Sequence, residues 1–356
     1  MSFPIGNRQV GPGEPTYVVA ELSCNHQGSF ERAVELIRAA KAAGADAVKL
    51  QTYTPETMTL QSENEYFRIR GSVPGEGQML YDLYREAATP WEWHPKLQAL
   101  AEQLGIGFFS TAFDPTAVAF LESLGVPVHK VASFELVDLP LIEAAARTGK
   151  PLILSTGMAT LEEIQEAVGA ARAAGAAQLM LLKCTSAYPA QPDEMHLRTI
   201  PRLRELFNVP VGVSDHTLGM TVPVVAVALG ACLVEKHFTV SRASASPDSP
   251  FSLEPDEFKA MVEAIRLAEQ AMGSVRYGAS EREAASRVFR RSLFVAKDVQ
   301  SGERFTADNV SSVRPGHGLH PRHLRQIIGC TATREIARGT PLSWDLVCRD
   351  EARLAR

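Results

Sequence analysis

Short apolar runs that end abruptly in polar residues recur along this chain. The run VPVGV (209–213) is followed by Ser214-Asp215-His216, and the run ACLVE (231–235) by Lys236-His237. Runs of this length, entered from an Asn or a Gly, predict parallel strands that are buried on both faces. The polar residues then lie at the carboxyl ends of the strands, where open α/β sheets and (β/α) barrels build their sites.

A junction of helix, glycine and strand repeats through most of the chain. Glycine, and sometimes asparagine, supplies the left-handed residue that ends a helix and turns the chain. The junction residues are Gly44, Gly105, Gly125, Gly149, Gly175, Asn208 and Gly230. Together with a first strand at 17–22, these seven junctions predict eight strands that alternate with helices. That count and order favour a closed (β/α)8 TIM barrel over a Rossmann sheet.

One connection is out of scale with the others. Segment 53–90 is far longer than the few residues usual for a βα loop, and it contains TPETMTL, EYFRIRG and the Gly-rich SVPGEGQ. On the active face of a barrel this insertion would form a lid or a rim. The alternative is a surface excursion with no role.

The pattern changes after the last barrel helix, which we expect at 257–272. Residues 275–291 are charged and linker-like, and 293–347 shows short strands with Gly- and Pro-containing turns and no long helical period. We therefore expect a barrel domain over 1–275, a linker over 276–291 and a small, mostly β domain over 292–356.

Composition narrows the class of protein. The net charge of −5 gives no reason to expect a nucleic-acid partner, which requires a basic face. The five cysteines include no C-x-x-C pair, which indicates reduced thiols in a cytoplasmic protein. The N-terminus has no apolar signal-peptide segment, and no run approaches the roughly 20 apolar residues of a membrane span.

Polar residues at the strand ends carry the candidate chemistry. His216 and His237 end two consecutive strands, and two imidazoles so placed could share a divalent metal ion. The alternative is that each histidine caps its strand and bonds locally. Lys49, Lys130 and several Ser and Thr residues also end strands. Lysine charge and hydroxyl donors suit a phosphate and a carboxylate, so we expect an anionic substrate beside a metal ion.

Several of these stretches resemble a known family. AELSCNHQG, AVKLQTYTPETMTL, YREAATPWEWH, KVASFELVDLPLI, ILSTGMATLEEI, LLKCTSAYP, VGVSDHTLG and LVEKHFT closely resemble the nonulosonic acid synthases, the sialic acid synthase family. The tail FRRSLFVAKDVQSGERFTADNVSSVRPGHGLHP resembles the antifreeze-like (SAF, β-clip) domain of that family. YTPETMTL, TPWEWH and RPGHGLHP most resemble pseudaminic acid synthases, and sialic and legionaminic acid synthases are more distant.

This resemblance implies a reaction and a set of site residues. The family condenses phosphoenolpyruvate with an N-acylated amino sugar in its open aldehyde form and with water, giving a nine-carbon 2-keto acid and phosphate. His216 and His237 match the ligands of Mn²⁺, Mg²⁺ or a similar ion. The phosphoenolpyruvate positions are matched by Lys49, Thr111, Lys130, Ser133, Ser155, Ser186 and Ser214. Positions that face the sugar or the metal ion are matched by Glu21, Gln51, Tyr188 and Asp248.

Two further positions, Glu135 and Arg314, complete the implied site, and Ser186 departs from the family pattern. Glu135 matches the acidic residue near C2 of phosphoenolpyruvate, and we expect it to act in catalysis with Glu21 and Lys49. Ser186 stands where the sialic acid synthases have Asn, so fewer hydrogen-bond donors are available there for the phosphate of phosphoenolpyruvate. Arg314 matches an arginine that the tail inserts into the site of a partner subunit, which implies a domain-swapped homodimer.

Two other functions are compatible with parts of the pattern. Lys183 ends the sixth strand and could serve a Schiff-base aldolase, although the two histidines would then have no task. The tail could instead bind a partner or a surface while the barrel is inert. The sequence leaves open whether the sugar is a 2,4-diacetamido-2,4,6-trideoxyhexose or N-acetylmannosamine.

Overall fold

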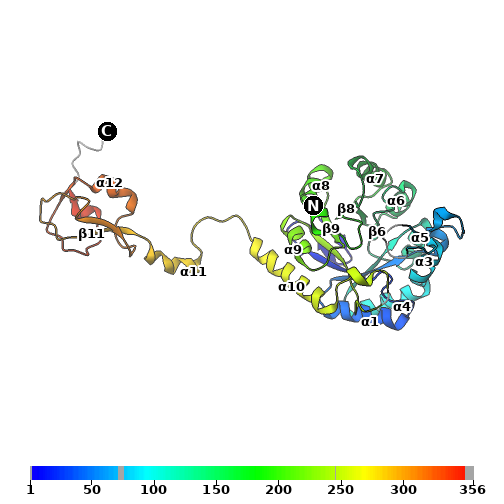
Figure 1. Ribbon diagram of the computed structural model, residues 1–356. Coiled ribbons are helices and arrows are strands. Elements are labelled where there is room, and N and C mark those ends of the chain that lie inside the picture. Colours follow the sequence, from blue (N-terminus) through cyan, green and yellow to red (C-terminus); the bar gives the residue numbers. More distant parts are fainter. Residues whose placement is uncertain (1, 71–75, 245, 349–356) are drawn as a thin grey trace. The chain divides into compact units, whose positions relative to one another are not determined.

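The computed structural model describes residues 2–70, 76–244 and 246–348. The chain forms two compact units, Met1–Gly273 and Ser274–Arg356, each described below by itself (Figure 1). The first unit holds a closed barrel of parallel strands, in the order β10-β3-β4-β5-β6-β7-β8-β9. This confirms the predicted barrel.

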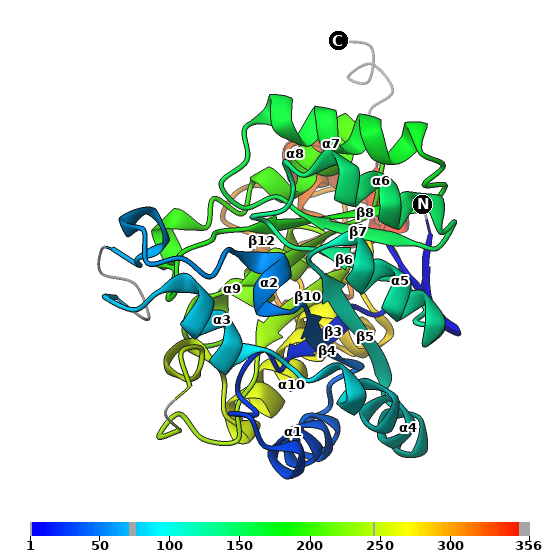
Figure 2. The same cartoon turned by 90° about the vertical axis from the view of Figure 1, so that its right-hand side faces the viewer.

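The eight barrel strands alternate with helices that surround them (Figure 2). The strands are β3 (Tyr17–Glu21), β4 (Ala47–Thr52), β5 (Gly107–Ala112), β6 (His129–Val131), β7 (Leu152–Ser155), β8 (Leu179–Cys184), β9 (Val211–Asp215) and β10 (Leu233–His237). The outer helices are α1 (Phe30–Ala42), α4 (His94–Leu104), α5 (Pro115–Ser123), α6 (Leu139–Arg147), α7 (Leu161–Ala173), α8 (Thr199–Phe207), α9 (Thr221–Ala228) and α10 (Pro255–Met272).

The glycine junctions have the backbone geometry that their position requires. Gly105 ends α4 at φ 63° and Asn208 ends α8 at φ 54°, both in the left-handed region. The other five predicted junction residues also have positive φ. These junctions let each helix stop and the next strand start within a few residues.

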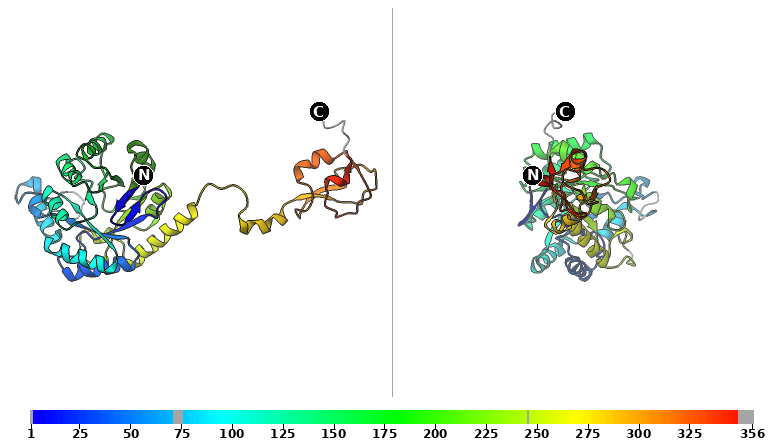
Figure 3. Two further views of the ribbon diagram at one scale, coloured as in Figure 1. Left: turned by 180° about the vertical axis from the view of Figure 1, so that it is seen from behind. Right: turned by 90° about the vertical axis from the view of Figure 1, so that its left-hand side faces the viewer.

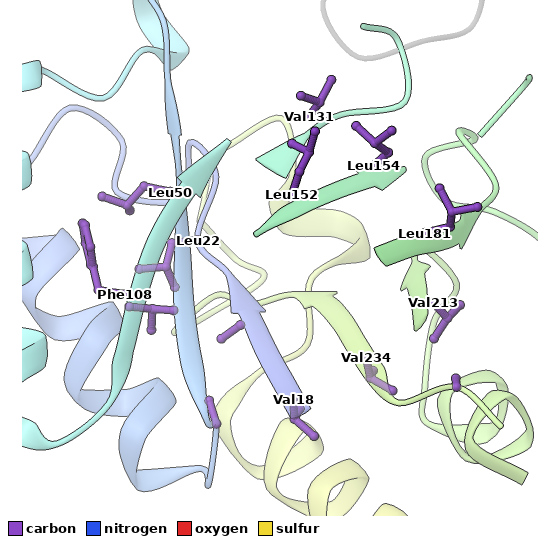
Figure 4. Close-up of a cluster of buried hydrophobic side chains, with 14 of the residues drawn as sticks. Val18, Leu22, Leu50, Phe108, Val131, Leu152, Leu154, Leu181, Val213 and Val234 are labelled. Atoms are coloured by element: carbon purple, nitrogen blue, oxygen red, sulfur yellow. The ribbon is translucent and has the colours of Figure 1, made fainter. Parts of the chain in front are cut away.

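Side chains alternate between the two faces of each barrel strand, as the two-residue period of a strand requires. On β3, Val18 and Ala20 pack outward in the large cluster between strands and helices, whereas Val19 belongs to a separate inner cluster. Figure 4 shows outward-packed side chains of this kind, among them Val18, Leu50 and Val234. The inner face is therefore apolar toward the amino ends of the strands and polar at their carboxyl ends.

A short N-terminal hairpin, which the sequence pattern did not reveal, completes the inner cluster. Strands β1 (Phe3–Ile5) and β2 (Arg8–Val10) pair antiparallel, with Phe3 opposite Val10 (Figure 3, dark blue). Phe3, Ile5 and Val10 are buried against inner residues such as Tyr17. The hairpin thus covers the amino end of the barrel interior.

The 53–90 insertion has structure of its own. It contains α2 (Pro55–Met58), the 3-10 turn η1 (Glu65–Phe67) and α3 (Leu80–Ala87), while residues 71–75 of its Gly-rich part lie outside the described residues. The Trp91 indole N–H donates to the Tyr53 carbonyl oxygen at 3.1 Å, which joins the two ends of the insertion. The base of the insertion is therefore fixed to the barrel.

The second unit is small and built from short antiparallel strands, as predicted. Its elements are α11 (Glu281–Ala284), η5 (Ala285–Phe289), β11 (Ser292–Val295), β12 (Val310–Val313), η6 (Pro321–His323), α12 (Leu324–Ile327), β13 (Thr331–Ala332), η7 (Trp344–Leu346) and β14 (Val347–Cys348). Its own core includes Leu293, Phe305 and Leu346. Helical turns at 281–289 occupy part of the stretch expected as a linker. The end of the expected tail domain, 349–356, lies outside the described residues.

Two findings bear on the predictions from composition. Within the described residues, none of the helices combines the length and the apolar character needed to cross a membrane. All five cysteines are free thiols.

We expect Phe3→Ala to lower the free energy of unfolding of the barrel unit by about 3 to 5 kcal/mol, because it leaves a cavity beneath the barrel interior. The measurement is urea unfolding followed by the fluorescence of the barrel tryptophans. Gln9→Ala, on the exposed side of the same hairpin, is the control and should stay within about 0.5 kcal/mol of the parent. A Phe3→Ala loss below about 1 kcal/mol would mean that the hairpin does not seal the interior.

Candidate active site

The polar residues at the carboxyl ends of the strands form a small, deep pocket inside the barrel, of about 60 Å³. It is lined by Glu21, Lys49, Gln51, Thr111, Phe113, Lys130, Ala132, Ser133, Phe134, Ser155, Cys184, Tyr188, Ser214, His216, Glu235 and His237. Strand register explains the convergence, since Glu21 pairs with both Lys49 and His237, and Ser214 pairs with Glu235. Parallel pairing brings these chain-distant side chains to the same height.

Two lysines and two carboxylates meet in this pocket. Lys49 Nζ forms an ion pair with Glu21, lies 3.6 Å from Glu235 Oε1 and donates to Thr111 Oγ1 at 2.8 Å. Lys130 Nζ lies 4.0 Å from the same Glu235 oxygen. All four charged side chains are at most 7% exposed. Burying such charges is tolerable only because each has a partner.

Glu235 was not among the predicted site residues. It lies inside the apolar run ACLVE and was counted there as the end of the run. The signal that identifies it is its spacing: it precedes His237 by two residues on one strand, so both point to the same face. Ser214 Oγ donates to Glu235 at 3.2 Å, which fixes the carboxylate between the lysines.

Burial perturbs the titration of this group of charges. Burial raises the pKa of Glu21 to about 7, and the opposing charge of Lys49 offsets the effect only in part. Burial also lowers the pKa of Lys130, although Glu235 counteracts it. For Lys49 the carboxylates of Glu21 and Glu235 outweigh burial, so its pKa lies above the ordinary value. A fixed ammonium group thus remains at the base of the pocket.

The two predicted metal-ligand histidines lie side by side. Their ring centroids are 5.2 Å apart, and the Phe251 ring lies 4.9 Å from that of His237. His216 Nδ1 is 2.9 Å from the Thr185 carbonyl oxygen. A carbonyl only accepts, so Nδ1 carries the hydrogen, and in the neutral ring Nε2 keeps its lone pair. His237 Nδ1 is buried without a hydrogen-bond partner, 3.7 Å from Asp248 Oδ2.

These donors fit a divalent metal ion bound through two protein ligands. Imidazole nitrogen suits several divalent ions, and a backbone carbonyl that orients the ligand ring is a usual feature of metal-binding histidines. Among the described residues, no group of three or more His, Cys, Asp and Glu side chains is arranged to hold a metal ion. Further ligands would have to come from water or substrate.

Hydroxyl groups and one glycine shape the wall near the ends of β6 and β7. Ser133 Oγ accepts the Gly157 N–H at 3.0 Å, and Ser155 Oγ is buried without a partner. A Cβ at Gly157 would lie 2.3 Å from Ser186 Oγ and 2.8 Å from Ser133 Oγ. Only glycine therefore lets the turn after β7 approach both serines this closely.

A wider cavity of about 370 Å³ adjoins the deep pocket and shares Gln51, Tyr188 and His237 with it. Glu135 and Asp248 also line this cavity. Burial raises the pKa of Glu135 to about 7, and its Oε2 is buried without a hydrogen-bond partner. Ser23 Oγ donates to the Asp248 carboxylate, which holds that side chain beside His237.

Some strand-end residues lie elsewhere. Lys183 shares a strand face with Leu179 and Leu181, which pack outward, and its Nζ donates to the Cys184 carbonyl oxygen at 2.6 Å. Ser186 touches the wall near Gly157 but lines neither cavity among the described residues. Arg314 is exposed and belongs to the second unit.

The buried pair Asp215 and Lys236 also lies away from the pocket. Asp215 shares a strand face with Val211 and Val213, and Lys236 with Val234, all of which pack outward. Lys236 Nζ donates to Asp215 Oδ2 at 2.5 Å, and both side chains are fully buried. These two strand-end residues hold β9 against β10 rather than face a ligand.

Comparisons with known proteins agree with this architecture. The chain is 45% identical to the pseudaminic acid synthase of Helicobacter pylori over 93% of this chain and 98% of that protein. It is 36% identical to the N,N'-diacetyllegionaminic acid synthase of Legionella pneumophila over 96% of this chain and 97% of that protein.

A solved relative is the N-acetylneuraminic acid (sialic acid) synthetase of Leptospira borgpetersenii in complex with citrate. It matches with a TM-score of 0.72 and 30% identity over 80% of this chain and 95% of that chain. Residues 36–277 match the sequence model of the NeuB family, and residues 290–347 match the sequence model of the SAF domain. The chain therefore belongs to the NeuB family.

Proposed function

We propose that this protein condenses phosphoenolpyruvate, a 2,4-diacetamido-2,4,6-trideoxyhexose in its open aldehyde form and water into a nine-carbon nonulosonic acid and phosphate. The observation that carries the proposal is the deep pocket, in which two buried lysines and several hydroxyls lie beside two histidines. The 45% identity to a pseudaminic acid synthase supports this choice of sugar.

The deep pocket suits phosphoenolpyruvate, a small trianion. Lys49 and Lys130 supply positive charge for its phosphate and carboxylate. Hydroxyl donors for the same groups come from Thr111, Ser133, Ser155 and Ser214, which line the pocket. Ser186, beside Gly157, does not line it and is proposed as a donor from the family resemblance alone. The unpartnered Ser155 Oγ fits this role, because a buried hydroxyl without a partner is costly until a ligand arrives.

The wider cavity suits the sugar. Gln51, Tyr188 and Asp248 line it beside His237 and offer amide, phenol and carboxylate groups for hydroxyl and acetamido substituents. We assign Glu21, which lines the deep pocket beside Lys49, to the reacting end of the sugar. Placement of the two substrates in adjoining cavities brings C3 of phosphoenolpyruvate toward the aldehyde carbon.

His216 and His237 are proposed to hold a divalent metal ion, such as Mn²⁺ or Mg²⁺. A bound ion of this kind supplies Lewis-acid polarisation of the sugar aldehyde. The chain's own residues orient that site: the Thr185 carbonyl oxygen fixes the His216 ring, and Phe251 packs against His237.

The chemistry then needs proton transfer at two places. When C3 of phosphoenolpyruvate bonds to the aldehyde carbon, the aldehyde oxygen takes a proton, and we assign its delivery to the Glu21–Lys49 ion pair. Water adds to the resulting cationic C2, and Glu135 takes the proton of that water. Phosphate leaves when the C2–O bond breaks. Lys183 has no part in this scheme, and its outward position also disfavours a Schiff-base aldolase.

Phosphate release from phosphoenolpyruvate, assayed with a panel of sugars, tests this function. We expect release with a 2,4-diacetamido-2,4,6-trideoxyhexose, loss of release after EDTA and recovery with Mn²⁺ or Mg²⁺. In ¹⁸O water the released phosphate should stay unlabelled, because the bond that breaks is C–O. Labelled phosphate would indicate attack at phosphorus, and EDTA-resistant turnover with borohydride trapping would indicate a Schiff base.

We expect the pH dependence of turnover to report Glu135. The general base must be ionised, and a pKa of about 7 predicts that the rate rises roughly tenfold from pH 6 to pH 8. Glu135→Gln should lower the rate by about 10²-fold or more and flatten that rise. If Glu135→Gln keeps the same rise with pH, the rise belongs to another group and the assignment is wrong.

The second unit is proposed to complete the site of a partner subunit. Arg314 is exposed in a Pro-Gly turn, and a guanidinium group suits the amide carbonyl of an acetamido substituent. The proposed assembly is a domain-swapped homodimer in which each site combines one barrel with the other chain's tail.

Mixing two inactive variants tests this assembly. We expect activity to return when Lys49→Ala and Arg314→Ala chains exchange subunits, because one site of each heterodimer then has both residues intact. Random exchange should restore about a quarter of the activity of the unsubstituted enzyme, since half of the dimers are mixed and half of the sites in a mixed dimer are intact. A mixture as inactive as its parents would show that each tail serves its own barrel.

A further inference from the structure

Two chemically different sets of side chains line the wider cavity. Gln51, Glu135, Tyr188 and Asp248 can all form hydrogen bonds. The insertion contributes Tyr53, Met58, Leu83, Tyr84 and Ala87, which offer mostly apolar surface. A ligand that fills this cavity therefore meets both polar and apolar groups.

Helix α3 is amphipathic, yet its apolar face is not part of a hydrophobic core. Leu80, Leu83, Tyr84 and Ala87 recur at the i, i+3, i+4, i+7 spacing that places them on one face. The opposite face carries an ion pair between Asp82 and Arg85 at 2.9 Å. None of the helix's residues is fully buried. An apolar stripe that is only half covered and lines a site cavity is suited to contact with a ligand.

The stripe is held in place rather than free. Tyr53 packs edge-on against Tyr84 with ring centroids 5.8 Å apart, and against Phe113 at 5.3 Å. Thr89, just beyond the helix, is hydrogen-bonded to buried His26 at 3.0 Å. The apolar wall of the cavity is therefore positioned by the barrel itself.

Resting on the function proposed above, we propose that Leu83 and Ala87, with Met58, form a specificity wall that receives the C6 methyl group of a 6-deoxy sugar and disfavours a C6 hydroxymethyl group.

The chemistry of the wall gives the direction of the preference. A hydroxyl pressed against Leu83, Ala87 and Met58 would lose its hydrogen bonds to water and find no partner among those side chains. Tyr84 adds a phenol to the wall, and burial, followed by the charge of Glu135, raises the pKa of that phenol. A methyl group has no hydrogen bonds to lose on entering the same space, and it gains apolar contact with these side chains.

The test compares kcat/KM for phosphate release with two acceptors that differ only at C6, a 2,4-diacetamido-2,4,6-trideoxyhexose and its 6-hydroxy analogue. We expect the parent enzyme to prefer the deoxy sugar by at least about tenfold, the scale on which an apolar pocket discriminates small changes. Leu83→Asn supplies a donor and an acceptor in the wall and should bring that ratio toward one. Ala87→Ser is a second, smaller change with the same expected direction.

The matched control is Leu60→Asn, which makes the same substitution on the same insertion at a side chain that is 66% exposed and lines no described cavity. Its ratio should equal that of the parent. Circular dichroism and the KM for phosphoenolpyruvate should be unchanged in all three variants.

The outcomes separate the two proposals. If no sugar in the panel supports phosphate release, the proposed function fails and the wall has no substrate to select. If both sugars react equally well in the parent, or if a folded and active Leu83→Asn or Ala87→Ser variant keeps the parental ratio, the function stands and the specificity wall is wrong.

Discussion

The burial of four charges inside one barrel is the constraint on which the site depends. Glu21, Lys49, Lys130 and Glu235 come from strands β3, β4, β6 and β10 and meet where little water reaches. A single buried charge costs several kcal/mol, so none of the four is tolerable alone. Because the partners belong to different strands, their compensation requires the barrel to close in its observed register. Closure in turn keeps two lysine side chains in one pocket.

Successive side chains of a strand point to opposite faces, and this alternation decided which site residues could be predicted from the sequence. The change from apolar to polar residues located every strand end, and the repeated glycine junctions located the barrel. That change does not say which polar residue points inward. Lys183, Asp215 and Lys236 lie one position out of phase with the pocket and pack outward, whereas Glu235 has the phase of His237 and points in. Counting in steps of two residues back from His216 and His237 would have identified the inward-pointing residues of their strands.

Other features lie beyond what periodicity can reveal. The strands FPI and RQV are three residues each, too short for a pattern to emerge, and their place beneath the barrel depends on packing with residues far along the chain. The stripe on α3 looks in the sequence like any core-facing stripe. Its partner is a cavity, and cavities arise only when strands, loops and the insertion are assembled together.

The N-terminal hairpin affects how substrates can enter the barrel and products can leave it. Phe3, Ile5 and Val10 close the amino end of the barrel interior, while the deep pocket lies at the carboxyl ends of the strands, where the wider cavity adjoins it. With the substrates placed as proposed, the sugar in the wider cavity lies between the deep pocket and solvent. That placement favours entry of the smaller anion before the sugar. A barrel closed at one end thereby couples the order of binding to the shape of its interior.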